Sequence, residues 1–258
     1  MIGAFSFNGV ESSTYSLVCK SGNRVLLPSV KTRRIEIPGM SGAYDLDVNG
    51  VDYEYELRPI TMTIQYIGTS YDELRTRARS IAAWLSTQAW CKLIINDESD
   101  KYYWAKVTSQ IDFESLWQSG TCEITFDCQP FAYSVTETIL TFPLRVTDLD
   151  VEFGNPGTRT ITYKSPPGSR CWIEIVGSWT TLGIGMNGKT LVYGEAGSGT
   201  LTIDSIEMEV YLDAVNKLSV VTGNVDTFLE IVPGTNALVI AGTGLSIAIT
   251  VRYISLWL

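Results

Sequence analysis

Residues 70–86 have the sequence Ser70-Tyr-Asp-Glu-Leu-Arg-Thr-Arg-Ala-Arg-Ser-Ile-Ala-Ala-Trp-Leu-Ser86 and carry the clearest helical pattern in the chain. Their apolar residues recur at helical spacing, at Leu74, Ala78, Ile81 and Leu85. At about 100° per residue these positions form one stripe along a helix. We therefore predict a single amphipathic helix over about 70–86, with its stripe lying across a β-sheet.

The start of this helix has the spacing of a capping box. In that motif the Ser70 side chain accepts a hydrogen bond from the Glu73 amide, and the Glu73 carboxylate accepts one from the Ser70 amide. Asp72 and Glu73 also lie where the helix dipole favours negative charge. Arg75 and Arg79 fall outside the stripe, so we expect them to point away from the sheet.

Strand patterns lie on both sides of the helix. Apolar and polar residues alternate at 60–67, 91–95, 101–107 and 121–128. Such alternation is typical of half-buried strands, and the polar turn at 96–100 indicates a hairpin between two of them. The fold class that follows is mainly β, with an N-terminal β-rich domain that contains the one helix.

The run of strands ends at 129–133, because Pro130 cannot donate to a central strand ladder. Beyond Pro143 the character of the sequence changes. We place a domain boundary near residue 135, giving domains 1–135 and 136–258. The second has glycine turns at short intervals and no helical period, which predicts a β-sandwich. Two of its strand faces are expected to carry Met208, Val210 and Leu212, and Ile247, Ile249, Val251 and Tyr253.

The composition is that of a globular protein, with 45% hydrophobic and 18% charged residues in 258. No apolar run approaches the roughly 18 residues that span a bilayer, so we expect no membrane insertion. The first basic residue is Lys20, so we also expect no signal peptide and synthesis in a cytosol.

The chain contains no histidine, which excludes Ser-His-Asp and Cys-His nucleophile activation. Its five cysteines form no C-x-x-C pair, and we expect buried thiols. We predict no catalytic residue, no cofactor and no metal site.

The net charge of −9 argues against a protein that binds nucleic acid through its phosphates. Acidic residues are concentrated in 51–58, where strict alternation predicts a strand with Asp52, Glu54, Glu56 and Arg58 on one face and apolar residues on the other. A solvated outer face is the simpler interpretation of these acids.

Residues 183–190, Gly-Ile-Gly-Met-Asn-Gly-Lys-Thr, fit both the P-loop pattern and the dinucleotide-binding pattern. A P-loop needs a helix to begin at its end. Glycines at 194, 197 and 199 disfavour that helix. We therefore predict a hairpin that turns at Asn187-Gly188, without nucleotide binding.

Two pairs of carboxylates, Asp148 with Asp150 and Glu207 with Glu209, have the spacing of neighbours on one strand face. Such neighbours lie about 7 Å apart, within the range of inverting glycosidases. Glycosidase carboxylates usually flank a cleft from different elements, so we expect no enzyme activity.

Aromatic residues leave two interpretations open. Tyr102, Trp104, Trp172, Trp179 and Trp257 are candidate platforms for sugar rings. The same side chains can instead anchor cores and interfaces, where each buries a large area.

Three features together resemble the distal tail proteins of long-tailed bacteriophages, the siphophage tail component family. The opening Phe5-Ser-Phe-Asn-Gly9 is similar to that family's start, and the strand–helix–strand–hairpin order that ends in 126–133 is similar to its first domain. The third feature is the series Asn187-Gly188, Leu201-Thr-Ile-Asp204, Asn216-Lys217 and Pro233-Gly-Thr-Asn236.

The resemblance implies a structural virion protein of the tail tip or baseplate, assembled in the cytoplasm of a bacterial host. Its first domain would form a hexameric hub ring, and its second would be a galectin-like, jelly-roll or carbohydrate-module-like sandwich. The ring would join the tail tube protein to a tail-tip or tail-associated protein and let DNA pass. A receptor-binding protein or a cell-wall glycan is a further candidate partner.

Two residue-level hypotheses follow from the ring. Asp52, Glu54 and Glu56 are expected to face the lumen, where negative charge would let DNA slide. Arg75 and Arg79 are expected at the subunit interface. The alternative function, from another class, is a carbohydrate-binding or glycan-hydrolysing protein, either in the virion or secreted.

Overall fold

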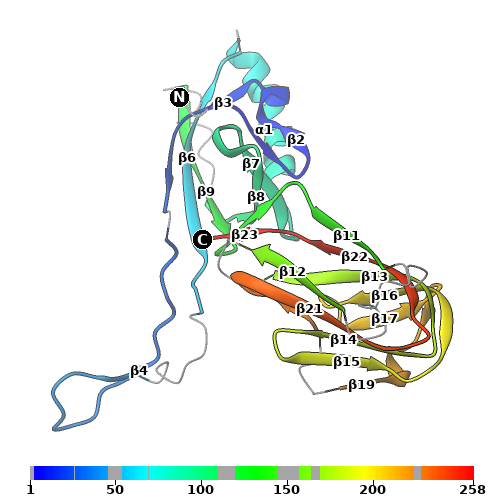
Figure 1. Cartoon of the computed structure of the whole chain (residues 1–258). Helices are drawn as coiled ribbons and strands as arrows, with labels where there is room; N and C mark the ends of the chain where they lie inside the picture. The colour runs from blue at the N-terminus through cyan, green and yellow to red at the C-terminus, as the bar shows by residue number, and fades with distance from the viewer. Residues whose placement is uncertain are drawn as a thin grey trace. The chain divides into compact units, whose positions relative to one another are not determined.

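The computed structural model describes residues 3–25, 27–45, 54–68, 70–109, 120–144, 157–163, 169–223 and 228–258. By its internal contacts the chain divides into two compact units, Met1–Val135 with Leu258, and Thr136–Trp257. Within the described residues there is one α-helix, α1 (Tyr71–Leu85), and the remaining regular structure is almost entirely antiparallel strand (Figure 1). The prediction of a mainly β protein with one helix is therefore confirmed.

The first unit is built on one antiparallel sheet in the order β2-β1-β7-β8-β9-β6-β3, with β10 paired to β8. Its strands are β1 (Phe5–Phe7), β2 (Val10–Glu11), β3 (Leu17–Arg24), β6 (Arg58–Tyr66), β7 (Cys91–Ile95), β8 (Lys101–Val107), β9 (Thr121–Cys128) and β10 (Ala132–Ser134). The short helices η1 (Ser12–Tyr15) and η2 (Asn96–Glu98) and the separate strand pair β4 (Arg34–Ile35) and β5 (Tyr44–Asp45) complete this unit. The hairpin between 91–95 and 101–107 forms as predicted.

Helix α1 packs its apolar stripe into the core of this unit. Leu74, Ile81 and Leu85 are at most 2% exposed, and Ala78 is half-buried. They belong to the same buried cluster as sheet residues such as Phe126. The stripe predicted from the sequence is therefore confirmed.

The predicted capping box is wrong. Ser70 is the N-cap residue, but its side chain makes no capping hydrogen bond, and only its carbonyl accepts the amide of Leu74 at 3.3 Å. The Glu73 carboxylate is bound elsewhere. It pairs with Arg77 at 2.6 Å and accepts a hydrogen bond from the Tyr66 hydroxyl at 3.2 Å.

The second unit consists of two main antiparallel sheets that share one core. Their orders are β11-β22-β13-β16-β17-β18 and β12-β21-β14-β15-β19, with β20 paired to β13. The strands are β11 (Thr138–Leu144), β12 (Gly157–Tyr163), β13 (Ser169–Trp179), β14 (Thr181–Met186), β15 (Lys189–Tyr193), β16 (Gly197–Asp204), β17 (Glu209–Leu212), β18 (Val215–Asn216), β19 (Val221–Gly223), β20 (Glu230–Ile231), β21 (Gly234–Thr243) and β22 (Ser246–Tyr253), with the short helix η3 (Leu218–Val220). Strand β23 (Leu256–Trp257) follows β22 and belongs to neither of these two sheets.

Strand β22 lies between β11 and β13, so both of its edges are paired. Its predicted inner face is confirmed, because Ile247, Ile249, Val251 and Tyr253 are all buried. The other predicted face is wrong at Met208. That residue is exposed, has a φ of 59° and lies in the turn before β17, so it does not share the strand face of Val210.

The predicted faces of 51–58 are also wrong where the chain enters the sheet. Arg58, expected outside, is only 2% exposed, whereas Leu57, expected inside, is exposed. Strand β6 begins at Arg58, and its core-facing row continues through Ile60 and Met62. Even-numbered side chains are thus exposed at Glu54 and Glu56 but face the core from Arg58 onward.

Candidate assembly surfaces

We call residues 25–57 the arm, and its described part, 25, 27–45 and 54–57, forms an extension between β3 and β6 (Figure 1). Its two runs lie antiparallel, because the Lys31 amide donates to the Glu54 carbonyl and the Glu56 amide donates to the Ser29 carbonyl, both at 2.8 Å. Further out, β4 pairs with β5. The described part of the arm is therefore a two-stranded ribbon.

This ribbon exposes many apolar side chains. Seven large hydrophobic residues of its described part are between 41% and 63% exposed: Val25, Leu27, Ile35, Ile37, Met40, Tyr44 and Leu57. Single exposed apolar residues are ordinary on protein surfaces, but a concentration in one segment marks an interaction site.

The predicted lumen-facing acids belong to the arm. Asp52 lies outside the described residues. Glu54 is exposed, and its carboxylate pairs with Arg33 at 3.3 Å and Lys31 at 3.7 Å, so nearby cations partly compensate its charge. Glu56 is also exposed.

Two arginines hold the root of the arm. Arg24, the last residue of β3, pairs with Asp97 and, at 2.6 Å, with Glu98 in the turn between β7 and β8. The buried Arg58 guanidinium lies 5.6 Å from the ring centre of Tyr103 on β8. Burial raises the pKa of the neighbouring Cys128 thiol to about 12, although the positive charge of Arg58 opposes this shift.

The outer face of α1 carries the two predicted interface arginines, Arg75 and Arg79. Both are exposed. No ion pair joins either of them to Glu54 or Glu56 in the described structure, so the two predicted groups lie on separate elements.

Strand β3 supplies a sheet edge. On one side it pairs with β6. On the other side, Cys19 forms an isolated antiparallel β-bridge with Gly3. The segment Lys20–Asn23 is exposed, and the register shifts beside Lys20. Within the described residues this half of the edge has no strand partner, and such an edge is a template for pairing with another chain.

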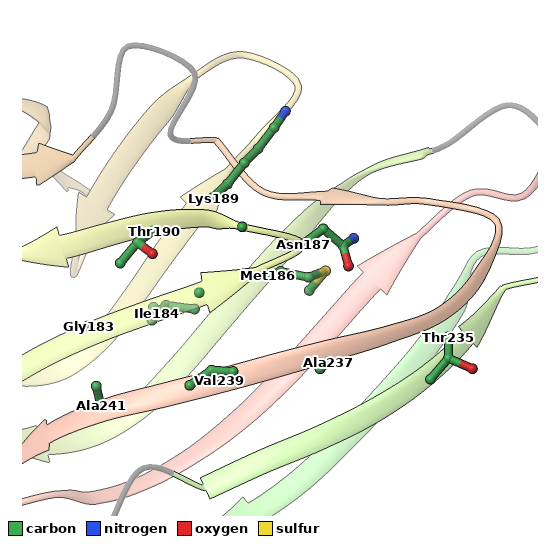
Figure 2. A pocket seen from close by; sticks show the side chains of 12 residues that line it. Gly183, Ile184, Met186, Asn187, Lys189, Thr190, Thr235, Ala237, Val239 and Ala241 are labelled. Carbon is green, nitrogen blue, oxygen red and sulfur yellow. The ribbon is translucent and has the colours of Figure 1, made fainter. Parts of the chain in front are cut away.

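The P-loop-like segment is a hairpin, as predicted. Strands β14 and β15 turn at Asn187 and Gly188, whose φ values of 52° and 79° are those of a two-residue hairpin turn. The Lys189 ammonium pairs with the Glu230 carboxylate at 3.4 Å. A shallow hollow of about 570 Å³ lies across β14, β15 and β21, and its described lining includes no aromatic residue (Figure 2).

The carboxylate pairs form no catalytic arrangement among the described residues. Asp148 and Asp150 lie outside them. Glu207 is exposed in a turn whose amide hydrogen bonds go to the Asp204 carboxylate, and Glu209 accepts a hydrogen bond from the Tyr211 hydroxyl. The described residues contain no group of three or more potential metal ligands, and no helix among them is long and apolar enough to span a membrane.

The candidate sugar platforms have different environments. Tyr102 and Trp179 are buried, whereas Trp104 and Trp172 are half-buried and Trp257 is 40% exposed. One cluster was not predicted from the sequence: the Lys92 ammonium lies 4.4 Å from the ring centre of Tyr102 and 5.7 Å from that of Trp104. Alternation on two paired strands could have indicated it, because Lys92 and Trp104 are direct cross-strand neighbours.

Comparisons with known proteins give two kinds of match. Residues 10–128 match the family model of the phage tail protein RIFT-related domain. The crystal structure of the phage SPP1 Dit protein, described as a paradigm of the hub adsorption apparatus in phages that infect Gram-positive bacteria, aligns over 100% of both chains with a TM-score of 0.76 at 12% identity. A chain of the phage P2 baseplate in its activated conformation with Ca aligns with a TM-score of 0.50 at 11% identity, over 99% of this chain and 98% of that one. A search of curated protein sequences finds no match.

Residues 10–128, within the β-rich first unit, therefore carry a domain of the phage tail RIFT-related type. The whole chain shares the fold of the SPP1 Dit protein. Both findings agree with the resemblance to distal tail proteins noted from the sequence.

Proposed function

We propose that the protein is the subunit of a hexameric hub ring at the distal end of a phage tail, and that it works by assembly without catalysing a reaction. The arm carries this proposal. Seven exposed apolar side chains on a two-stranded ribbon are costly in water and are stabilised when another surface covers them.

A second copy of the chain is the occupant that we propose for this surface. A closed ring requires a heterologous contact, in which one patch of a subunit meets a different patch of its neighbour. The arm supplies the first patch, and the body of the first unit supplies the second. The exposed edge at Lys20–Asn23 can add strand pairing, which satisfies backbone groups that solvent otherwise binds.

In the proposed ring, Asp52, Glu54 and Glu56 face the bore, where six copies give a wall that does not retain the phosphates of passing DNA. The exposure of Glu54 and Glu56 supports this part, whereas the pairing of Glu54 with Lys31 and Arg33 reduces its contribution. Arg75 and Arg79 are placed at the subunit boundary, since both are exposed cations on an acidic protein.

The partners that follow are the tail tube protein on one side of the ring and a tail-tip or tail-associated protein on the other. A receptor-binding protein would attach to the same hub. Assembly in the host cytoplasm is part of the proposal, because the ring must form before the tail is complete.

The test compares the mass of the full chain in solution with that of an arm variant. Replacing Ile35, Ile37 and Tyr44 with serine removes exposed apolar surface without touching the core, so we expect a folded protein that no longer forms rings. The matched control replaces three exposed aliphatic residues of the second unit, Val192, Ile206 and Val215, with serine and should leave the rings intact. Rings in the arm variant would contradict the role of the arm.

A further inference from the structure

The sheet β11-β22-β13-β16-β17-β18 has an inner face of buried residues and an outer face that solvent reaches. On the inner face, Ile173, Ile175 and Ile249 are fully buried. The residues that alternate with them point outward, and Trp172 on β13 is among these. We call this outer surface the Trp172 face.

Strand register places polar residues around Trp172. It lies directly opposite Arg252 of β22 on one side and Asp204 of β16 on the other, and Asp204 lies opposite Glu209 of β17. Adjacent strands are about 4.8 Å apart, so this row spans roughly 14 Å. It is long enough for more than one sugar ring.

The next outward row adds further hydrogen-bonding groups. Glu174, two residues after Trp172, pairs with Arg252 at 3.5 Å. Tyr211 lies opposite Thr202 and donates its hydroxyl hydrogen to the Glu209 carboxylate. That hydrogen bond raises the pKa of the Tyr211 phenol, which is protonated at neutral pH in any case.

These groups combine the two elements of sugar recognition. A half-buried indole offers a flat apolar ring, against which the C–H face of a sugar can stack. Carboxylates, a guanidinium and hydroxyls beside it can bind the sugar hydroxyls, and bonds to charged groups are the stronger ones. By contrast, the described lining of the hollow on the other sheet has no aromatic residue and fits this chemistry poorly.

We propose that the Trp172 face binds a neutral polysaccharide, with Trp172 as the stacking platform and Glu174, Asp204, Glu209, Tyr211 and Arg252 as hydrogen-bonding groups. The residues named here carry three carboxylates against one guanidinium, and Arg170, which also points outward on β13, adds a second guanidinium. The balance remains negative, so the face disfavours polymers that carry phosphate or carboxylate groups. This inference stands apart from the ring, because every residue that it uses lies in the second unit.

The experiment measures binding of the full-length protein to soluble β-linked hexamers of glucose and of N-acetylglucosamine by calorimetry, with polygalacturonate as an acidic comparator. We expect the wild-type protein to bind at least one neutral hexamer more tightly than the comparator. Trp172→Ala should weaken that binding by at least about tenfold, whereas Trp172→Phe, which keeps a flat ring, should retain most of it. Trp257→Ala removes an exposed tryptophan outside this face and should bind as the wild type does.

Several results would overturn the inference. These are no binding to either neutral hexamer, tighter binding to polygalacturonate, or equal binding by Trp172→Ala. If Trp172→Ala fails to fold, Trp172→Phe decides, because a folded phenylalanine variant without binding contradicts a stacking role. Loss of a protein partner in Trp172→Ala without any glycan binding would identify a protein interface instead. Ring mass measured on the same samples separates failure of this inference from failure of the ring proposal.

Discussion

Trp84 is the residue that links the helix to the first strand. Its indole nitrogen donates a hydrogen bond to the Phe7 carbonyl at 2.9 Å, and its ring stacks on Tyr15 at 5.0 Å and Phe5 at 5.8 Å. The predicted stripe omits Trp84, because it contains only positions on the strict helical pattern. Only the fold shows that η1 and β1 widen the buried side of the helix.

Replacing Trp84 with alanine should destabilise the first unit by about 3–5 kcal/mol, because the change removes a large buried ring. Trp84→Phe keeps most of the ring and loses the hydrogen bond, so a smaller loss of about 1 kcal/mol is expected. Urea unfolding measures both values, and hydrogen exchange assigns them to the first unit. Equal losses in the two variants would contradict a packing role for the ring.

Buried thiols predict a dependence of stability on alkaline pH. Burial raises the pKa of the Cys128 and Cys171 thiols from 9.0 to about 12. Between these values the folded protein keeps protons that the unfolded chain loses. The contribution of the thiols is therefore fully present below pH 9.0 and is lost as the pH rises towards about 12. The urea midpoint should fall over this range, and less steeply in the double variant Cys128→Ala, Cys171→Ala; equal slopes would contradict the assignment.

At the scale of elements, α1 and β22 could be predicted from the sequence. In each of them the apolar residues recur at the period of the element and are the residues that it buries. The helix start could not be predicted in the same way. A capping box is local in sequence, whereas Glu73 is bound by Arg77 and by Tyr66 on a neighbouring strand. Similarly, alternation alone placed Arg58 on the face of Glu54 and Glu56, and only the sheet shows that Arg58 is buried.

Ser70→Ala should therefore change the free energy of unfolding by less than about 0.5 kcal/mol, well below the roughly 1 kcal/mol that an N-cap side chain contributes. Glu73→Gln should destabilise the first unit more, since it removes the charge that binds Arg77. Denaturant unfolding measures the loss of free energy of unfolding in each variant. A larger loss in Ser70→Ala than in Glu73→Gln would contradict this account and support the capping box.

Arg24 is predicted to fix the root of the arm. Arg24→Gln removes the ion pairs with Asp97 and Glu98, and these partly exposed pairs contribute on the order of 1 kcal/mol. Hydrogen exchange at the arm amides of Lys31 and Glu56 should become faster, because the ribbon loses an anchor at its base. Glu123→Gln is the control, since it removes an exposed charge on β9 to which no role in assembly is assigned. Equal exchange in both variants would show that Arg24 does not hold the arm.

At the scale of the whole molecule, the order of motifs along the chain indicated a distal tail protein, and the family match over residues 10–128 and the fold shared over the whole chain agree with that indication. The surfaces proposed for assembly could be predicted from the sequence much less well. Residues 25–45 show little alternation of apolar and polar residues, so the apolar exposure of the arm became clear only from its isolation as a ribbon. The sequence likewise did not indicate which of the candidate aromatic residues best suits sugar binding. Strand register favours Trp172, because it places this residue beside Arg252 and Asp204.

The central claim is that the first unit closes the ring. The most direct measurement is the mass in solution of residues 1–135 and of residues 136–258, each expressed alone and shown to be folded. We expect 1–135 to assemble into rings of six copies, because the arm, the β3 edge and α1 all lie within it. The fragment 136–258 should remain monomeric. A folded 1–135 fragment that stays monomeric, with or without tail partners, would contradict this account.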